Sequence, residues 1–183
     1  MRYEENEITL RNGSNCIFRS PVPADAKDMI EYLKMASEES YFMTRYPEEI
    51  TVTVEDEVKY LEDSLKSDME FSIAAFVHGE LAGNASVKPL SANYKLAHRG
   101  GFGIAIKQKY WNLGIGNLLI QECLSQAVKA GYEQIELGVF ADNDKALNLY
   151  KKYGFEVWGR TENAFRLKDG TYRDEICMGK SLN

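Results

Sequence analysis

Apolar residues recur at helical spacing in four stretches of the chain. They predict helices over residues 25–35, 53–67, 117–130 and 143–153. Runs rich in β-branched and aromatic residues predict strands over residues 8–10, 16–19, 71–77, 81–88, 100–107, 133–140, 156–167 and 172–180. Strands alternate with helices in the middle, and hairpins stand at both ends. We therefore expect one α/β (α+β) domain over residues 1–183, with a mixed central sheet of about seven strands and helices on both faces.

A glycine-bearing turn, Gln108–Gly116, joins the strand at 100–107 to the helix that follows. Amide N–H groups at the start of a helix lack partners within the helix, and the helix dipole adds partial positive charge there. Gly114 and Gly116 lack the Cβ atoms that would keep an anion away from the backbone. This turn therefore predicts a phosphate-binding site.

A second motif follows the strand at 133–140. Asn143 suits an N-cap, and Gly154 stands where a glycine ends a helix. The helix between them has an apolar face that consists of Ala146, Leu147, Leu149, Tyr150 and Tyr153.

The two motifs occur together, at this spacing and in this order. The pattern Asn143-x-x-Ala146-x-x-Leu149-Tyr150-x-x-x-Gly154-Phe155, after a strand, a Gly-x-Gly turn and a helix, resembles the GNAT superfamily of N-acetyltransferases. The resemblance covers residues 101–155. It implies a sheet whose two central strands splay apart at a bulge, with acetyl-CoA in the resulting wedge. It also implies transfer of the acetyl group to a primary amine by direct attack in a ternary complex.

The resemblance further implies where the donor binds. Its pyrophosphate would contact the amides of Trp111, Asn112, Leu113, Gly114, Ile115 and Gly116. Its pantetheine arm would pair with the strand at Ile104, Ala105 and Ile106, and Asn143 and Ala146 would contact the cofactor. The family usually carries Gln or Arg where this chain has Trp111, so the sequence predicts no help from that side chain.

The resemblance also suggests the chemistry. Tyr150 matches the family's general acid, because a phenol stays protonated at neutral pH and can protonate a departing thiolate. The family often takes its base from a glutamate on the central strand, but residues 98–103 contain no carboxylate. Glu136 and His98 are the candidate bases. Glu38 and Glu39, after the first helix, are candidates for attracting a cationic amine.

Composition narrows the partners. A formal charge of −6 disfavours nucleic acid as a partner, and no apolar run is long enough to span a membrane. The start of the chain lacks a signal peptide's apolar segment, so we expect a cytoplasmic protein. Cys16, Cys123 and Cys177 have no metal-ligand spacing, so we expect no metal and three small packed side chains. The expected partner is a small-molecule, polyamine or peptide amine, and the protein is a monomer or homodimer.

Two other functions compete with acetyl transfer. A noncatalytic acyl-CoA-binding module would keep Gly114, Gly116 and Asn143, and the missing strand carboxylate is compatible with it. A mononucleotide-binding regulator would need a Lys-Ser/Thr pair after its last glycine, and none follows Gly116.

Overall fold

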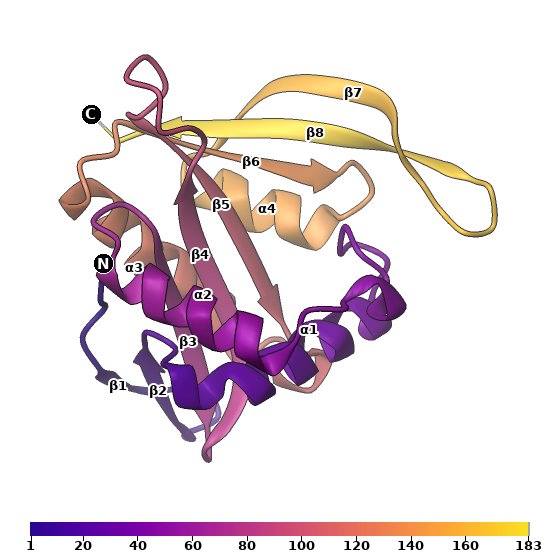
Figure 1. The fold of residues 1–183 in the computed structure, drawn as a ribbon. Helices are drawn as coiled ribbons and strands as arrows, with labels where there is room; N and C mark the ends of the chain where they lie inside the picture. Colours follow the sequence, from indigo (N-terminus) through magenta and orange to yellow (C-terminus); the bar gives the residue numbers. More distant parts are fainter. Residues whose placement is uncertain (183) are drawn as a thin grey trace.

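A computed structural model describes residues 1–182 (Figure 1). Its strands are β1 Asn6–Thr9, β2 Asn15–Arg19, β3 Phe71–Val77, β4 Glu80–Pro89, β5 Arg99–Ile106, β6 Gln134–Phe140, β7 Glu156–Arg166 and β8 Tyr172–Ser181. Its α-helices are α1 Ala26–Glu39, α2 Val54–Lys66, α3 Ile115–Lys129 and α4 Asp144–Lys152, and three short 3-10 helices are η1 Pro23–Asp25, η2 Pro47–Glu49 and η3 Gln108–Tyr110. Every predicted helix and strand is present.

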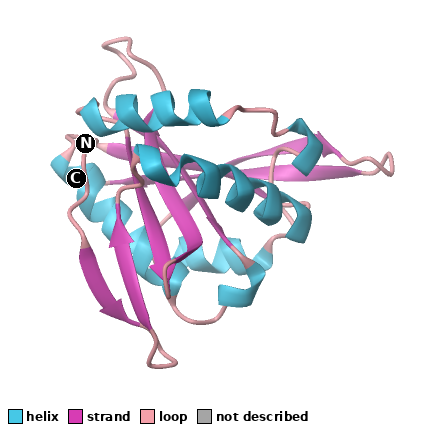
Figure 2. Ribbon diagram, turned by 60° about the horizontal axis from the view of Figure 1, so that its bottom comes forward, coloured by secondary structure: helices cyan, strands magenta, loops and turns pink. Residues whose placement is uncertain are grey.

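The eight strands form one sheet in the order β1-β2-β3-β4-β5-β6-β8-β7. Neighbours are antiparallel except β5 and β6, which run parallel. Figures 1 and 2 show α1 and α2 in front of the strands and α3 and α4 behind them. The predicted mixed sheet with helices on both faces is confirmed, with eight strands where about seven were expected.

Each face of the sheet has its own hydrophobic core. The larger core packs α3 and α4 against the sheet through residues such as Ile115, Leu119 and Tyr150. The smaller one packs α1 and α2 against Ala74 and Phe76. Burial of these side chains is the main force that holds the layers together. Within residues 1–182, no helix is long and apolar enough to cross a membrane.

The helix ends follow the capping residues in the sequence. The Asn143 side chain accepts a hydrogen bond from the amide of Ala146 at 3.2 Å, and Thr53 caps α2 in the same way. Gly154 has a φ of 80°, as expected for a glycine that ends a helix. The first helix is longer than predicted: α1 continues to Glu39 and buries Ala36.

The parallel strands β5 and β6 separate soon after they begin. They pair only from Arg99 to Gly101, opposite Gln134 to Glu136. Beyond this point β5 continues beside β4 with no shift in register. The splay is therefore present, while the bulge expected there does not show as a break in the β4–β5 register.

A side chain from α1 reaches into the β4–β5 ladder. The Tyr32 hydroxyl donates to the carbonyl of Ala105 at 2.7 Å and accepts from the amide of Asn84 at 3.1 Å. Tyr32 is only 1% exposed, and its burial raises the pKa of the phenol. The bridging hydroxyl fixes α1 against β5 beside the splay.

Candidate active site

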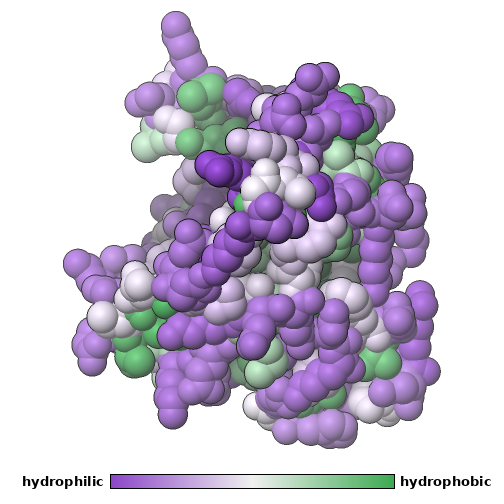
Figure 3. Space-filling view, turned by 90° about the vertical axis from the view of Figure 1, so that its right-hand side faces the viewer, coloured by the Kyte–Doolittle hydropathy of each residue, from purple (hydrophilic) through white to green (hydrophobic). Residues whose placement is uncertain are grey.

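A cleft of about 780 Å³ lies where β5 and β6 diverge. Most of its lining comes from β5 with the glycine turn, from α4, and from the end of α1 with the connection that follows. Arg11, two residues of β4 and the end of β6 complete it. Figure 3 shows the side of the molecule on which the α1–α2 connection and the β7–β8 hairpin lie, with a largely hydrophilic surface that is hollowed between its upper and lower parts.

The second half of the glycine turn, residues 112–116, has amides without backbone acceptors among the described residues. Gly114 has a φ of 93° and is the N-cap of α3, and Asn112 has a φ of 64°. Within the described residues, the first amide of this helix with a backbone acceptor is that of Leu118, which donates to Gly114. The amides of residues 112–117 are therefore available at a helix N-terminus, as an anion site requires.

Trp111 lies apart from these amides. Its own amide donates to the carbonyl of Gln108 at 3.0 Å, and its indole Nε1 donates to the carbonyl of Ile106 at 2.6 Å. The Trp111 amide therefore already has a partner within the turn, and its place in the phosphate site stays a prediction. The indole instead ties the turn to the end of β5, and Lys145 lies over the ring at 4.1 Å.

A guanidinium from the first hairpin lies against the turn. Arg11 lines the cleft, and a Cβ placed on Gly114 would lie 3.4 Å from its Nε atom. Its amide donates to the carbonyl of Leu113 at 3.4 Å. Sequence patterns did not point to this residue, because about 100 residues separate it from the turn. It brings a positive charge to a site where the family's usual Gln or Arg is missing.

Glu80, at the start of β4, anchors residues 107–110, where β5 passes into the glycine turn. Its carboxylate accepts hydrogen bonds from Lys107 at 3.0 Å, Lys109 at 2.5 Å and the Tyr110 hydroxyl at 2.9 Å. These contacts, with Lys109 foremost, lower the pKa of Glu80 to about 2. Three bonds to one carboxylate hold η3, the first part of the turn, in place ahead of residues 112–116.

The free edge of β5 offers only part of what was expected. Lys107 and Arg99 bond to β4, so the odd-numbered residues of β5 face β4 and the even-numbered ones face the gap. Ile104 therefore turns its N–H and C=O toward the cleft. Ile106 does too, but its carbonyl is taken by Trp111. Ala105 faces β4, and its carbonyl accepts from Tyr32, so of the three predicted residues Ile104 has the main-chain groups open to a donor.

Tyr150 lies where the two motifs meet. It is 7% exposed, lines the cleft and packs edge-on against Phe102, with ring centroids 6.2 Å apart. Burial raises the pKa of Tyr150 to about 12. Among the described residues no side-chain polar atom is both fully buried and unpartnered, and no hydrogen bond within the chain involves this hydroxyl. The hydroxyl is therefore a protonated donor that opens into the cleft.

The neighbouring residues of α4 also line the cleft. The Asn143 side-chain oxygen and the Ala146 amide are bonded to each other, which leaves the amide nitrogen of the Asn143 side chain free to bind. Ala146 contributes its small side chain. Both therefore lie where the sequence placed them.

The two candidate bases are outside this cleft. Glu136 is held by two hydrogen bonds from Arg99, which lower its pKa, and it lines a second, smaller cavity. His98 lies in the loop before β5, where its carbonyl accepts from the amides of Glu133 and Gln134. The Glu136 carboxylate is engaged by Arg99 and His98 lines neither cavity, so we do not assign the base to them.

The opposite half of the cleft is rich in aromatic and apolar side chains. Those lining it include Tyr32, Leu33, Ala36, Phe42, Met43 and Phe140. Phe140 stacks on Phe165 of β7 with centroids 3.9 Å apart, and Phe42 packs edge-on against Phe140 at 5.8 Å. Glu39 lines the same half, but its carboxylate accepts from the amide of Gln108 at 2.6 Å. Glu38 is exposed outside the cleft.

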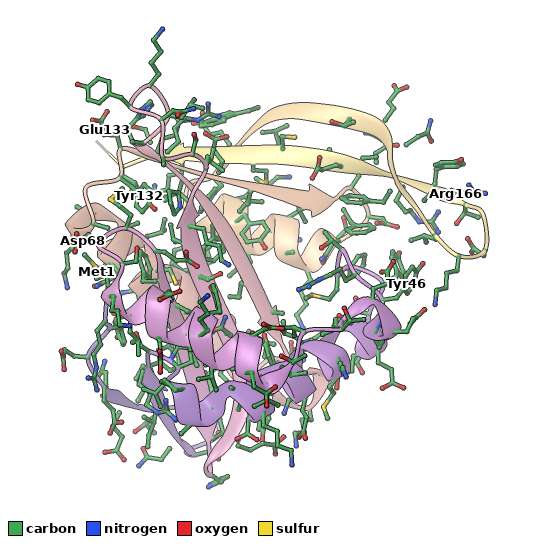
Figure 4. All side chains as sticks on the ribbon, viewed as in Figure 1. Met1, Tyr46, Asp68, Tyr132, Glu133 and Arg166 are labelled. Atoms are coloured by element: carbon green, nitrogen blue, oxygen red, sulfur yellow. The ribbon has the colours of Figure 1, made fainter. Side chains whose placement is uncertain are left out.

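The α1–α2 connection, residues 40–53, is fastened to the last hairpin. The Tyr46 hydroxyl accepts from the amide of Lys168 at 2.9 Å, and the Lys168 ammonium pairs with Glu48 and lies over the Tyr46 ring. Figure 4 shows Tyr46 on the same side of the molecule as Arg166, at the end of β7. We call the contacts of Lys168 with Tyr46 and Glu48 the clasp. The clasp lies at the end of the molecule where the aromatic half of the cleft is built.

The sequence profile of the acetyltransferase (GNAT) family matches residues 29–155. The chain belongs to the GNAT acetyltransferase family. The matched segment contains the glycine turn and α4, so the resemblance carried by those motifs is confirmed. Within residues 1–182, no group of three or more His, Cys, Asp or Glu side chains is arranged to hold a metal ion.

Solved GNAT structures share the whole fold. An acetyltransferase of the GNAT family from Streptococcus pneumoniae is 29% identical, with a TM-score of 0.87 over 91% of this chain and 99% of that one. The yncA protein of Salmonella typhimurium, solved with acetyl-CoA, is 17% identical, with a TM-score of 0.80 over 92% of this chain and 94% of that one.

Curated GNAT relatives match over shorter segments. The L-amino acid N-acetyltransferase AaaT of Escherichia coli is 30% identical over 109 residues, which are 59% of this chain and 66% of that protein. An N-alpha-acetyltransferase of Sulfurisphaera tokodaii is 38% identical over 76 residues, 40% of this chain and 44% of that protein. The chain thus spans less than two thirds of either relative.

Proposed function

We propose that this protein transfers the acetyl group of acetyl-CoA to a primary amine, by direct attack in a ternary complex. One observation carries the proposal. The unpartnered amides of residues 112–117 and the hydroxyl of Tyr150 open into a single cleft between two splayed strands. A phosphate site at one end and a buried phenol at the other suit a phosphorylated donor with a reactive thioester.

The donor half fits acetyl-CoA group by group. The diphosphate lies on the amides of residues 112–116, with the Arg11 guanidinium beside it. The amide-rich pantetheine arm pairs with the free N–H and C=O of Ile104, as an added strand pairs with a sheet edge. The yncA protein of Salmonella typhimurium, which shares the fold, was solved with acetyl-CoA, and this supports the same donor here.

The chemical step needs an acid for the leaving thiolate. The amine nitrogen attacks the thioester carbonyl carbon, the C–S bond breaks, and the CoA sulfur takes a proton from Tyr150. Because burial raises the pKa of Tyr150 to about 12, the phenol is protonated at neutral pH and can donate. Holding both substrates in one cleft supplies a further part of the acceleration.

The acceptor is a primary amine that enters through the aromatic half of the cleft. Phe42, Met43 and Phe140 offer apolar surface to the body of the amine. One relative is named an L-amino acid N-acetyltransferase and another an N-alpha-acetyltransferase, so small molecules, polyamines and peptides all belong in the test. A cytoplasmic location and a monomeric or homodimeric state stay predictions from the sequence.

The test separates an enzyme from a noncatalytic binding module. Acetyl-CoA binding is measured by calorimetry, and the protein is then incubated with acetyl-CoA and a broad panel of amines. We expect micromolar-range binding, thiol release above the water background, and an acetylated amine by mass spectrometry. Binding with no acetylated amine from any member of the panel would refute the transferase and favour the module.

A further inference from the structure

Glu175 of β8 pairs with Phe140 of β6, and its side chain extends over Gly138, two residues earlier on β6. A Cβ atom placed on Gly138 would overlap the carboxylate of Glu175, and the three heavy atoms nearest to it all belong to Glu175. The Glu175 carboxylate thus occupies the place that a side chain at position 138 would take. A strand position without a side chain is filled by a carboxylate from the next strand.

This carboxylate lies where the splayed strands open. Gly138 lines the main cleft, together with Phe102 and Tyr150. Glu175 lines a second cavity of about 330 Å³, and the two cavities share Phe102 and Gly138 as lining residues. Phe102 therefore lines both cavities, and its ring also packs against Tyr150.

The other carboxylates near the cleft are already engaged. Glu39 accepts from the Gln108 amide, Asp142 accepts from Tyr41 and pairs with Arg173, and Glu136 is held by Arg99. Within residues 1–182, no Lys, Arg or His nitrogen lies within 4.0 Å of Glu175, and its one polar side-chain contact is with the Cys177 thiol at 3.9 Å. Glu175 is therefore a half-buried carboxylate whose charge is not neutralised by a cation.

We propose that Glu175 is the proton acceptor for the amine, a role that rests on the acetyl transfer proposed above. In this role it replaces the central-strand glutamate that many GNAT enzymes use. Its carboxylate belongs to β8 and extends over Gly138 of β6. An ammonium acceptor gives one proton to Glu175. The freed lone pair forms the C–N bond, the C–S bond breaks, and the CoA sulfur takes the proton of Tyr150.

The remaining extra proton on nitrogen returns to the tyrosinate, and Glu175 releases its proton to solvent. The products are the amide, the CoA thiol and one proton, so the step balances.

The titratable groups that share the second cavity with Glu175 are Cys177 on the same strand and Glu136 on β6, with its partner Arg99. β5 contributes only Gly101 and Phe102 to that cavity.

The test compares Glu175→Gln with the wild type over pH 5.5 to 9.5, on an amine that the wild type acetylates. We expect kcat/KM at neutral pH to fall about 100-fold, the usual contribution of a general base. Without the base, the variant depends on free amine from solution. Its log kcat/KM should then rise with a slope of about one up to the pKa of the amine, whereas the wild type levels off at lower pH. Acetyl-CoA affinity should be unchanged.

A matched control removes a carboxylate elsewhere on the same sheet. Glu156→Gln changes an exposed residue of β7 and should leave both the rate and the pH profile as in the wild type. An unchanged profile in Glu175→Gln, with or without a slower rate, overturns the proposal, because a structural role slows the enzyme without changing its dependence on free amine. A wild type that binds acetyl-CoA and acetylates nothing refutes the transferase itself, and this result is seen before any variant is made.

A rescue variant tests the position of the charge. Glu175→Ala clears the space at position 138, so Gly138→Glu in the same chain can place a carboxylate there from β6. We expect the kcat/KM of the double variant to be at least tenfold higher than that of Glu175→Ala. Its pH profile should match that of the wild type. A double variant that folds, binds acetyl-CoA and stays as slow as Glu175→Ala counts against the proposal. If Glu175→Gln loses its cooperative unfolding transition, the double variant and Glu175→Asp decide the question.

Discussion

The two halves of the cleft are built in different ways. The donor half consists mainly of main-chain groups from two short segments, Gln108–Gly116 and the start of α4. The acceptor half consists of side chains from α1, the connection after it, the end of β6 and, behind them, Phe165 of β7. A phosphate site is made by local backbone geometry, whereas the acceptor pocket depends on residues that meet only in the folded chain.

This difference has a functional meaning. Backbone amides at a helix N-terminus recognise a diphosphate whatever side chains surround them, so the donor half suits one invariant substrate. A single substitution can replace a side chain such as Phe42 or Phe140, so we expect the acceptor half to set the selectivity for the amine. Variants in the two halves should therefore alter different kinetic constants.

The largest effect should come from Tyr150→Phe, at the junction of the two halves. The change removes only the hydroxyl and keeps the packing against Phe102 and Phe155. We expect kcat to fall about 100-fold with the acetyl-CoA Kd unchanged, because the lost group acts on the leaving thiolate. Steady-state kinetics and calorimetry measure the two constants. Tyr153→Phe, on the same helix end, is the control, and equal turnover by the two variants would remove the acid role from Tyr150.

Phe42→Ala should affect the acceptor half alone. Loss of a ring that packs on Phe140 removes apolar contact with the amine, so its KM should rise about tenfold. The acetyl-CoA Kd should not change, and Tyr94→Ala, which alters a side chain that is 96% exposed, is the control. A rise in the acetyl-CoA Kd of similar size would show that the two halves are not separate.

Arg11→Ala should affect the donor half alone. The guanidinium lies against Gly114, so its loss should weaken acetyl-CoA binding about fivefold at low salt and less at high salt. Pantetheine, which lacks the diphosphate, should bind equally well to both proteins. Arg2→Ala is the control for loss of an exposed positive charge elsewhere. Equal loss of pantetheine affinity would contradict a contact with phosphate.

The smallest effect should come from Glu80→Gln, which loosens the segment before the glycine turn. The pKa of Glu80 is lowered from an ordinary value of 4.5 to about 2, so its ion pairs stabilise the fold above pH 4.5 and are lost as the pH falls toward 2. The carboxylate is 42% exposed, so we expect the variant to melt only about 2 °C lower at pH 7. Thermal unfolding from pH 7 to pH 3 should show this difference shrink below pH 4.5. A difference that persists unchanged at pH 3 would exclude the carboxylate as its source.

The sequence predicted most of what local patterns determine. Helical spacing located all four helices, and Asn143 and Gly154 located the ends of α4 because caps are properties of a few adjacent residues. The glycine turn was predicted for the same reason. The partners of individual main-chain groups came only from the structure, in which the amide of Trp111 donates to Gln108 and Ala105 of β5 faces β4.

Residues that act across the sheet left no sequence signal. Arg11 reaches Gly114 from the first hairpin, and Glu175 reaches Gly138 from the last. Glu136 carries the right group for a base, but its pairing with Arg99 depends on two strands coming together. The chemical group at one position can therefore be predicted from the sequence. Which charged residue lies beside it in space can be known only once the strand order is known.

The clasp holds the rim of the acceptor pocket through one lysine and its two partners, on segments that contribute no amide to the phosphate site. The β7–β8 hairpin and the α1–α2 connection can therefore be replaced together, by evolution or by design, while the donor half stays unchanged. A fold divided in this way can acquire new acceptor substrates while it keeps the same acetyl donor.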